Sequence, residues 1–236
     1  MMKSHTYSYL IMLFIVTAFV TQSVPADGAS GKRGDMVVLD AMEAELKRSM
    51  RSLRLDGYEA PYFISYQIKD NINHSITGKY GAVVSSNNER ERKLFVDVRV
   101  GDYEFDNAIN GRSGGNVPYY DASSVPLDND PVAIRTALWQ VTDYAYKEAL
   151  TQYFNKKAGD VQDVNDEDIA SFTKESPHTF IGPELSLVFD REEWERNIRD
   201  ISSIFKDYED IFNADIVFTA QKETVYFVNT EGTKYV

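Results

Sequence analysis

The sequence predicts an α+β fold in which an antiparallel or mixed sheet carries long amphipathic helices on one face. Two observations lead to this fold class. Apolar residues recur every three or four positions over 36–54, 130–157 and 190–206, as in helices that bury one side. Between and after these helices, the runs over 61–100 and 214–236 alternate apolar with polar residues, as half-buried antiparallel strands do.

The composition fits a globular protein and excludes several classes of function. Apolar residues make up 43% of the 236 positions, and 15 Tyr and 13 Phe supply large surfaces for a core. The formal net charge of −12 disfavours binding to a nucleic acid or to an anionic membrane surface. The chain has no cysteine, which excludes disulfides, thiol catalysis and thiolate metal sites.

The first 26 residues are typical of a secretory signal peptide. Lys3 precedes an apolar run over 10–20, which is shorter than the roughly 20 residues that a membrane-spanning helix needs. Val24-Pro25-Ala26 follows, and we expect cleavage after Ala26; an uncleaved membrane anchor is the alternative. Residues 27–35 are small and polar and predict a flexible leader. We therefore expect an exported protein, periplasmic or extracellular, whose domain covers 36–236.

A helix over 36–54 opens this domain. Its apolar stripe is typical of core-facing side chains, with Asp35 placed to cap the start and Gly57 just past the end. The residues of the stripe are Met36, Leu39, Met42, Leu46, Met50 and Leu53. Three alternating runs follow over 61–69, 72–85 and 93–100. The turn-forming pairs Asp70-Asn71 and Asn87-Asn88 separate them, which predicts a three-stranded antiparallel meander.

The helix over 130–157 has the clearest signals of the chain. Asp130 is placed to cap it, and Pro131 stands at its first position, which helix starts favour. Its many aromatic residues predict that it packs on the sheet. The stretches 101–129 and 158–188, which flank this helix, are rich in turn-forming or acidic residues and predict loops.

A last helix and a last group of strands complete the chain. The helix over 190–206 is predicted to turn Trp194, Ile198, Ile201 and Phe205 inward. Strands follow over 214–236, with a turn at Asn229–Gly232. The sequence stops within a strand-like run at Thr233–Val236, which predicts an unpaired sheet edge and association of chains through the C-terminal strands.

The sequence offers no recognisable catalytic, cofactor-binding or metal-binding residue. His74 and His178 are isolated and form no helical metal pair. Gly111–Gly115 lacks the Gly-Lys-Ser/Thr ending of a phosphate loop. The acidic residues over 160–168 lack the glycine of a calcium loop and favour a solvated loop. No cofactor is therefore predicted in this chain.

Five stretches of the sequence resemble one family. They are Glu59-Ala-Pro-Tyr-Phe-Ile-Ser-Tyr66, Gly81-Ala-Val-Val-Ser-Ser86, Val98-Arg-Val-Gly-Asp-Tyr-Glu-Phe-Asp-Asn107, Pro126-Leu-Asp-Asn-Asp130 and Ala137-Leu-Trp-Gln-Val-Thr-Asp-Tyr-Ala-Tyr-Lys147. Together they resemble the N-terminal region of exported TldD/PmbA-type metallopeptidase-related proteins, over roughly 36–236. Asn229-Thr-Glu-Gly232 is similar to the Asn-Ser-x-Gly turn of that family.

The resemblance implies an α/β N-terminal domain followed by a second, mostly β domain. In the family, that second domain holds a metal, zinc, on a His-Glu-x-x-x-His helix, and dimers enclose a proteolytic chamber. This sequence ends before any such motif, so no catalytic or metal residue is carried over to it. The resemblance therefore implies a truncated or split N-terminal portion that contributes to a substrate cleft or to dimer contacts without hydrolysing peptides.

Two other functions stay open at the level of sequence. The chain is alternatively a stand-alone exported binding or interaction module that pairs its sheet edge with a partner. A further alternative is an enzyme that uses an unrecognised pair of catalytic carboxylates. A chain with 37 acidic residues always offers candidates for such a pair. A peptide substrate would belong to a complete protein of the family.

Overall fold

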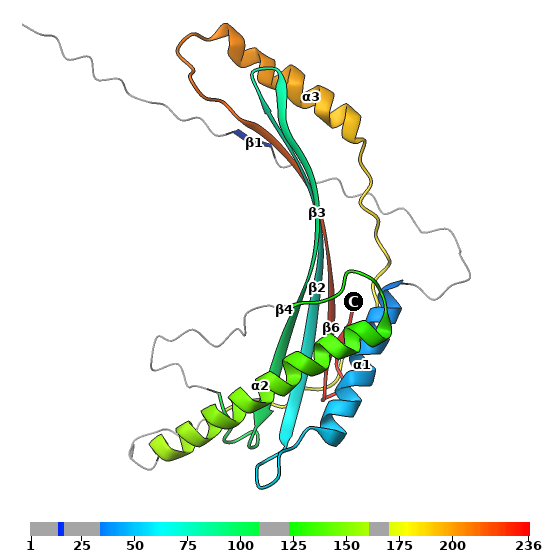
Figure 1. Ribbon diagram of the computed structural model, residues 1–236, viewed down its shortest axis with the longest axis vertical. Helices are drawn as coiled ribbons and strands as arrows, with labels where there is room; N and C mark the ends of the chain where they lie inside the picture. Colours follow the sequence, from blue (N-terminus) through cyan, green and yellow to red (C-terminus); the bar gives the residue numbers. More distant parts are fainter. Residues whose placement is uncertain (1–13, 17–33, 109–122, 161–169) are drawn as a thin grey trace, which may run out of the picture. The chain divides into compact units, whose positions relative to one another are not determined.

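The computed structural model describes residues 14–16, 34–108, 123–160 and 170–236 (Figure 1). In chain order the elements are β1 (Phe14–Val16), α1 (Gly34–Ser52), β2 (Pro61–Lys79), β3 (Ala82–Val100), β4 (Ser123–Ser124), α2 (Pro131–Asp160), β5 (Thr179–Phe180), α3 (Arg191–Ser203), the 3-10 turn η1 (Ile204–Asp207), β6 (Ile216–Asn229) and β7 (Lys234–Tyr235). In this described part, no helix is both long and apolar enough to cross a membrane.

The strands form one mixed sheet, which confirms the α+β fold class. Their order across the sheet is β4-β3-β2-β6-β7-β5, and β1 pairs beside β6. The β6–β7 and β3–β4 pairs are antiparallel, whereas β1 and β5 run parallel to their partners. The chain divides into two compact units. One contains β1 with residues 72–90 and 185–222, and the other contains α1, α2, β4, β5, β7 and the remaining parts of β2, β3 and β6.

The predicted three-stranded meander is wrong, because β2 and β3 form a single long hairpin. Each strand is 19 residues long, and the pairs Asp70-Asn71 and Asn87-Asn88 lie inside strands. The turn is at Tyr80 and Gly81, whose φ angles are +44° and +77°. Positive φ at both central residues suits the twist of a tight hairpin. The Tyr80 hydroxyl donates to the carbonyl of Ile211 (2.8 Å), which holds this unusual turn residue in place.

Helices α1 and α2 pack on one face of the sheet in the second unit, as predicted (Figure 1). Alternate residues of β2, β3 and the end of β6 meet the apolar stripes of both helices in a continuous core. Asp130 caps α2 as predicted: its Oδ1 accepts from the backbone N–H groups of Val132 (2.9 Å) and Ala133 (2.7 Å). Helix α1 begins at Gly34, so Asp35 lies inside its first turn and does not precede it.

Helix α3 covers the strands of the other unit. Ile198 is buried against Ile76, Ile216 and Phe218, and Trp194 stacks on Phe218 with ring centroids 3.9 Å apart. The prediction that Ile201 faces inward is wrong, since 41% of it is exposed. Ser202 is buried instead, and its hydroxyl accepts from the backbone N–H of Gly81 (2.9 Å). The helical period predicts an apolar residue, Ile201, on the buried side of α3. The buried residue is instead the polar Ser202, which bonds to the hairpin turn.

The C-terminal residues do not leave a free sheet edge, so the predicted unpaired ending at Thr233–Val236 is wrong. Strand β7 pairs with β6 on one side and with β5 on the other. The Lys234 N–H donates to the carbonyl of His178 (2.8 Å), and the Val236 N–H donates to the carbonyl of Phe180 (3.0 Å). Segment 178–182, which was predicted to be a loop, thus pairs with the backbone groups of β7 that were expected to be unpaired.

The expected signal peptide, leader and Gly111–Gly115 loop lie almost entirely outside the described residues. Three residues of the apolar run over 10–20 are described, and they form β1. Phe14 to Val16 pair in parallel with Ile216 to Phe218 of β6. Of the acidic residues over 160–168, those from 161 onward lie outside the described part.

Candidate functional site

The stretch Val98–Asn107, which carries the most specific part of the family resemblance, folds back on itself directly after β3. Gly101 has a φ of +106° and pairs with Asp106 in an isolated bridge. A Cβ at Gly101 would collide with the carbonyl oxygen of Phe105, so the close approach requires glycine. The Asp102 carboxylate accepts from the N–H groups of Glu104 and Phe105 (2.9 Å each), which closes the turn.

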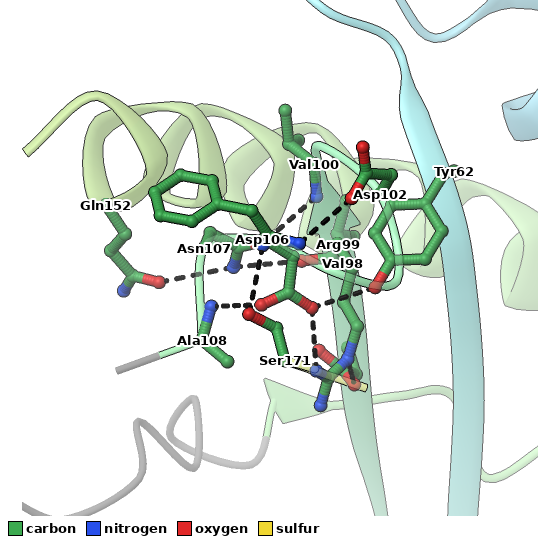
Figure 2. A network of polar contacts seen from close by, with 12 residues as sticks. Tyr62, Val98, Arg99, Val100, Asp102, Asp106, Asn107, Ala108, Gln152 and Ser171 are labelled. Carbon is green, nitrogen blue, oxygen red and sulfur yellow. Dashed lines mark hydrogen bonds and ion pairs between the residues drawn. The ribbon is translucent and has the colours of Figure 1, made fainter. Parts of the chain in front are cut away.

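Asp106 is the centre of a polar network at this turn (Figure 2). The residue is fully buried, at 0% exposure. Its Oδ2 accepts from the Tyr62 hydroxyl (2.8 Å) and from the Arg99 Nη1 (2.9 Å), and its Oδ1 accepts from the N–H of Ala108 (2.7 Å). Three donors from three segments thus converge on one carboxylate, which fixes where the loop after β3 leaves the sheet.

The donors to Asp106 are themselves held in place. Arg99 Nε also bonds to Asp97 (3.0 Å), and its guanidinium lies 3.9 Å from the centroid of the Phe172 ring. Burial, and then the bond to Asp106, raises the pKa of the Tyr62 hydroxyl far above its ordinary value. Tyr62 therefore remains a protonated donor at physiological pH and is unsuited to act as a base or a nucleophile.

Asn107 ties the same turn to α2. Its Oδ1 accepts from the N–H of Val100 (2.8 Å), and its Nδ2 donates to the Val98 carbonyl and to Gln152 of α2 (3.4 Å each). Both ends of the amide are used, as a buried amide requires. Ser171 closes the network from the following segment, where its hydroxyl accepts from the N–H of Asp106 (3.2 Å).

A second buried ion pair holds the stretch Pro126–Asp130, which also belongs to the resemblance. Arg92 of β3 is buried, and its Nε and Nη2 both bond to Asp70 of β2 (3.0 and 2.5 Å). The same guanidinium donates to the carbonyl of Pro126 (2.8 Å) and to the side chain of Asn129 (2.9 Å). Arg92 thereby positions the segment that leads into the cap of α2.

These two networks give the stretches Val98–Asn107 and Pro126–Asp130 a structural role. Every charged side chain of Asp70, Arg92, Arg99 and Asp106 is paired with a partner on the protein. These pairs join β2, β3 and the segments that follow them, so the arrangement fixes loops. A nucleophile with an adjacent base, which covalent catalysis needs, is not formed by these residues.

The described residues do not bring the histidines into a metal site. The His74 ring packs edge-on against Phe189 (4.7 Å between centroids), and the backbone of His178 pairs with β7. No group of three His, Asp or Glu side chains in the described ranges could hold a metal ion. Zinc, which the resemblance implies for a second domain, therefore finds no fitting ligand set in this part of the chain.

An open pocket of about 610 Å³ lies between α1 and the end of β6 with its turn to β7. Its volume is in the range of ligand sites, which is roughly 300–1,000 Å³. The lining combines apolar side chains of α1 and β6, charged side chains and the Asn229–Gly232 turn: Glu43, Leu46, Lys47, Met50, Arg51, Val228, Asn229, Thr230, Gly232, Thr233 and Lys234.

Sequence reasoning did not single out this pocket. It assigned Leu46 and Met50 to the core and gave no role to the charged residues beside them. The available signal was the pair Lys47 and Arg51, which stand four residues apart and so share one helix face next to the apolar stripe. The Asn229–Gly232 turn was predicted correctly, with Gly232 at a φ of +97°.

Comparisons with known proteins find structural likeness only among solved structures. No family model matches the chain, and no curated protein matches it. Among solved structures it is similar to TldE from Thermococcus kodakarensis, with a TM-score of 0.41 and 10% sequence identity. The alignment covers 82% of this chain and 36% of that chain, so the chain spans about a third of the length of that protein.

Proposed function

We propose that the chain is a non-catalytic binding portion of an exported TldD/PmbA-like protein, and that its ligand site is the pocket between α1 and the Asn229–Gly232 turn. The resemblance stretches support the family relation. The observation that carries the binding role is the pocket itself. It is lined by the turn that resembles the family's Asn-Ser-x-Gly turn, and it presents apolar and charged side chains but no nucleophile–base pair.

The turn gives the pocket a rigid wall. The Thr230 N–H donates to the Ile64 carbonyl (3.0 Å), and its hydroxyl accepts from the Ile64 N–H (3.2 Å). Asn229 Oδ1 accepts from the N–H of Thr233 (2.8 Å). A wall whose polar groups are already bonded loses little freedom on binding, which favours recognition. In a complete protein this wall would belong to the substrate cleft or to a dimer contact.

A peptidase assay combined with a binding assay tests this role. We expect no hydrolysis of a peptide library with or without added zinc, no stoichiometric zinc in the purified chain, and retention of a subset of the peptides. Substitution of Met50 by Asp should abolish retention, whereas Val132→Asp on α2, at an exposed position outside the pocket, should not. Hydrolysis that persists through purification would contradict the non-catalytic role, and retention unaffected by Met50→Asp would contradict the site.

Export is tested at the N-terminus of the secreted protein. Cleavage after Ala26 predicts a mature chain that begins at Asp27, which mass spectrometry of the periplasmic or extracellular fraction measures. Detection of the intact residues 1–26 in the membrane fraction would instead support the anchor.

A stand-alone interaction module is the second candidate, and the exposed edge of β5 favours it. Phe180 of this two-residue strand is 66% exposed, so the strand presents an apolar side chain beside an edge that another chain can extend. We expect concentration-dependent association in light scattering that Phe180→Asp reduces. The control Phe212→Asp, at another exposed phenylalanine, should leave it unchanged. A monomer at high concentration would contradict this candidate.

A further inference from the structure

We propose that the pocket between α1 and the Asn229–Gly232 turn takes an apolar group that ends in a carboxylate, with Arg51 as the anchor of that carboxylate. This inference rests on the proposed binding role and adds the chemistry of the ligand. It follows from the apolar floor of the pocket, the excess of positive charge on its rim, and which of its polar groups are already hydrogen-bonded or ion-paired.

The floor of the pocket is apolar. Leu46 and Met50 of α1 face Val228 of β6, and Val228 is 1% exposed. An apolar ligand body can cover these side chains, and each fully buried aliphatic or thioether group of such a ligand contributes through removal from water. Met50 lacks branching and can adapt its rotamer to the ligand.

The rim of the pocket carries an excess of positive charge. Lys47, Arg51 and Lys234 line it together with a single carboxylate, Glu43. This local excess stands on a chain whose formal net charge is −12. A cationic site on an acidic protein selects an anionic ligand locally, because the surrounding surface repels anions elsewhere.

The cations differ in how far they are already paired. Lys234 bonds to Glu43 at 2.7 Å, and Lys47 lies 3.7 Å from the same carboxylate. Within the described residues, the Arg51 guanidinium forms no ion pair, and the contact from Arg54 goes to the backbone carbonyl of Arg51. The N–H donors of the Arg51 guanidinium are thus available to a ligand, and their geometry matches a carboxylate in a bidentate pair.

The anion is more consistent with a carboxylate than with a phosphate. Glu43 lies in the same lining, and a second negative charge on the ligand increases the repulsion from it. The backbone N–H groups of the turn that could cradle a phosphate are engaged: the N–H of Thr230, Gly232 and Thr233 donate to Ile64, Asn229 and Asn229. Recognition therefore falls to the side chains of the rim.

Two sources of this chemistry are separated by the choice of probes. One is a free organic acid, represented by decanoate with decanol as its uncharged match. The other is the C-terminus of a chain, represented by a hexapeptide that ends in leucine, with its C-terminal amide as the match. Isothermal titration of the full chain with all four probes measures each affinity.

We expect at least one carboxylate probe to bind about tenfold more tightly than its uncharged match, the effect of one charge-assisted contact. Arg51→Gln should remove this preference. Arg54→Gln should keep it, since Arg54 is exposed and does not line the pocket. Binding of decanoate alone assigns the site to a small acid, and binding of the peptide alone assigns it to a chain end.

Three outcomes would overturn the inference: equal binding of charged and uncharged probes, binding unaffected by Arg51→Gln, or no binding of any probe. If library peptides bind in a Met50-dependent manner while these probes do not, the proposed binding role stands and the carboxylate preference fails. If neither library nor probes bind, both fail.

Discussion

Replacing Asp106 by asparagine tests whether the network after β3 holds the fold. The carboxylate is fully buried and accepts three hydrogen bonds, two of them from the Tyr62 hydroxyl and the Arg99 guanidinium. Asparagine has nearly the same shape but presents an N–H₂ group toward one side of the network. That group meets either the donors Tyr62 and Arg99 or the donor N–H of Ala108, so at least one bond becomes a donor–donor clash.

The expected loss follows from these contacts. Breaking a buried ion pair by removing one charge costs about 3–5 kcal/mol. Arg99 keeps its second partner Asp97, whose side chain is 43% exposed, so its charge does not become fully unpaired. We therefore expect Asp106→Asn to lower the free energy of unfolding by about 3 kcal/mol, at the lower end of that range. Tyr62→Phe removes one bond to the same carboxylate and should cost about 1.5–2 kcal/mol.

Tryptophan fluorescence can isolate the unit that holds this network. The chain contains two tryptophans, Trp139 in the unit of α2 and Trp194 in the other unit. In a Trp194→Phe background, urea unfolding followed at Trp139 should show a lower midpoint with an unchanged slope. A change within about 0.5 kcal/mol would refute the structural role of Asp106. An increase in stability would identify it instead as a strained functional carboxylate.

Three further predictions test other parts of the structure. Arg92→Met should destabilise by about 3–5 kcal/mol, and adding Asp70→Leu should recover part of the loss, because a buried pair is replaced more easily than halved; urea midpoints measure both, and a double variant weaker than Arg92→Met would contradict it. Gly101→Ala should cost at least about 2 kcal/mol from the positive φ and the collision with Phe105, whereas Gly159→Ala, which meets no atom within 4 Å, should be neutral or stabilising; equal effects would contradict this. Burial raises the pKa of Tyr62 and Tyr66 above the unfolded value of about 10, so their contribution to stability is complete below about pH 10 and is lost as pH rises toward the folded values; absorbance at 295 nm should show fewer tyrosines titrating in the native than in the unfolded chain near pH 10–11.

The period of the apolar residues was sufficient to predict the helices and the sheet, because burial on one face imposes that period on any sequence. It was not sufficient for the long hairpin. Asp70-Asn71 is typical of a turn in solvent, but the Asp70 carboxylate pairs with Arg92 inside the sheet. The sequence contained a signal for this: Arg92 stands two residues before Leu94, on the buried side of the alternation Leu94, Val96, Val98. A charge at a buried position requires a buried partner, and Asp70 is that partner.

The cost of burying a charge also explains why some charged residues stabilise the fold and others are available to a ligand. A buried charge such as Asp106 or Arg92 must be paired on the protein, and its partners fix the neighbouring segments of the chain. A residue that binds a ligand keeps its donors unpaired in the free chain, and it can do so at low cost only where it is exposed, as Arg51 is at the end of α1. Such a residue has the same pattern as any solvated helix face, so the period along the sequence cannot reveal it. What identifies Arg51 is its position in the folded chain: the exposed face of α1, the end of β6 and the Asn229–Gly232 turn, which is distant in sequence, enclose one pocket. The recognition chemistry of this protein is therefore expected at this pocket, and the Arg51→Gln titration addresses that expectation directly.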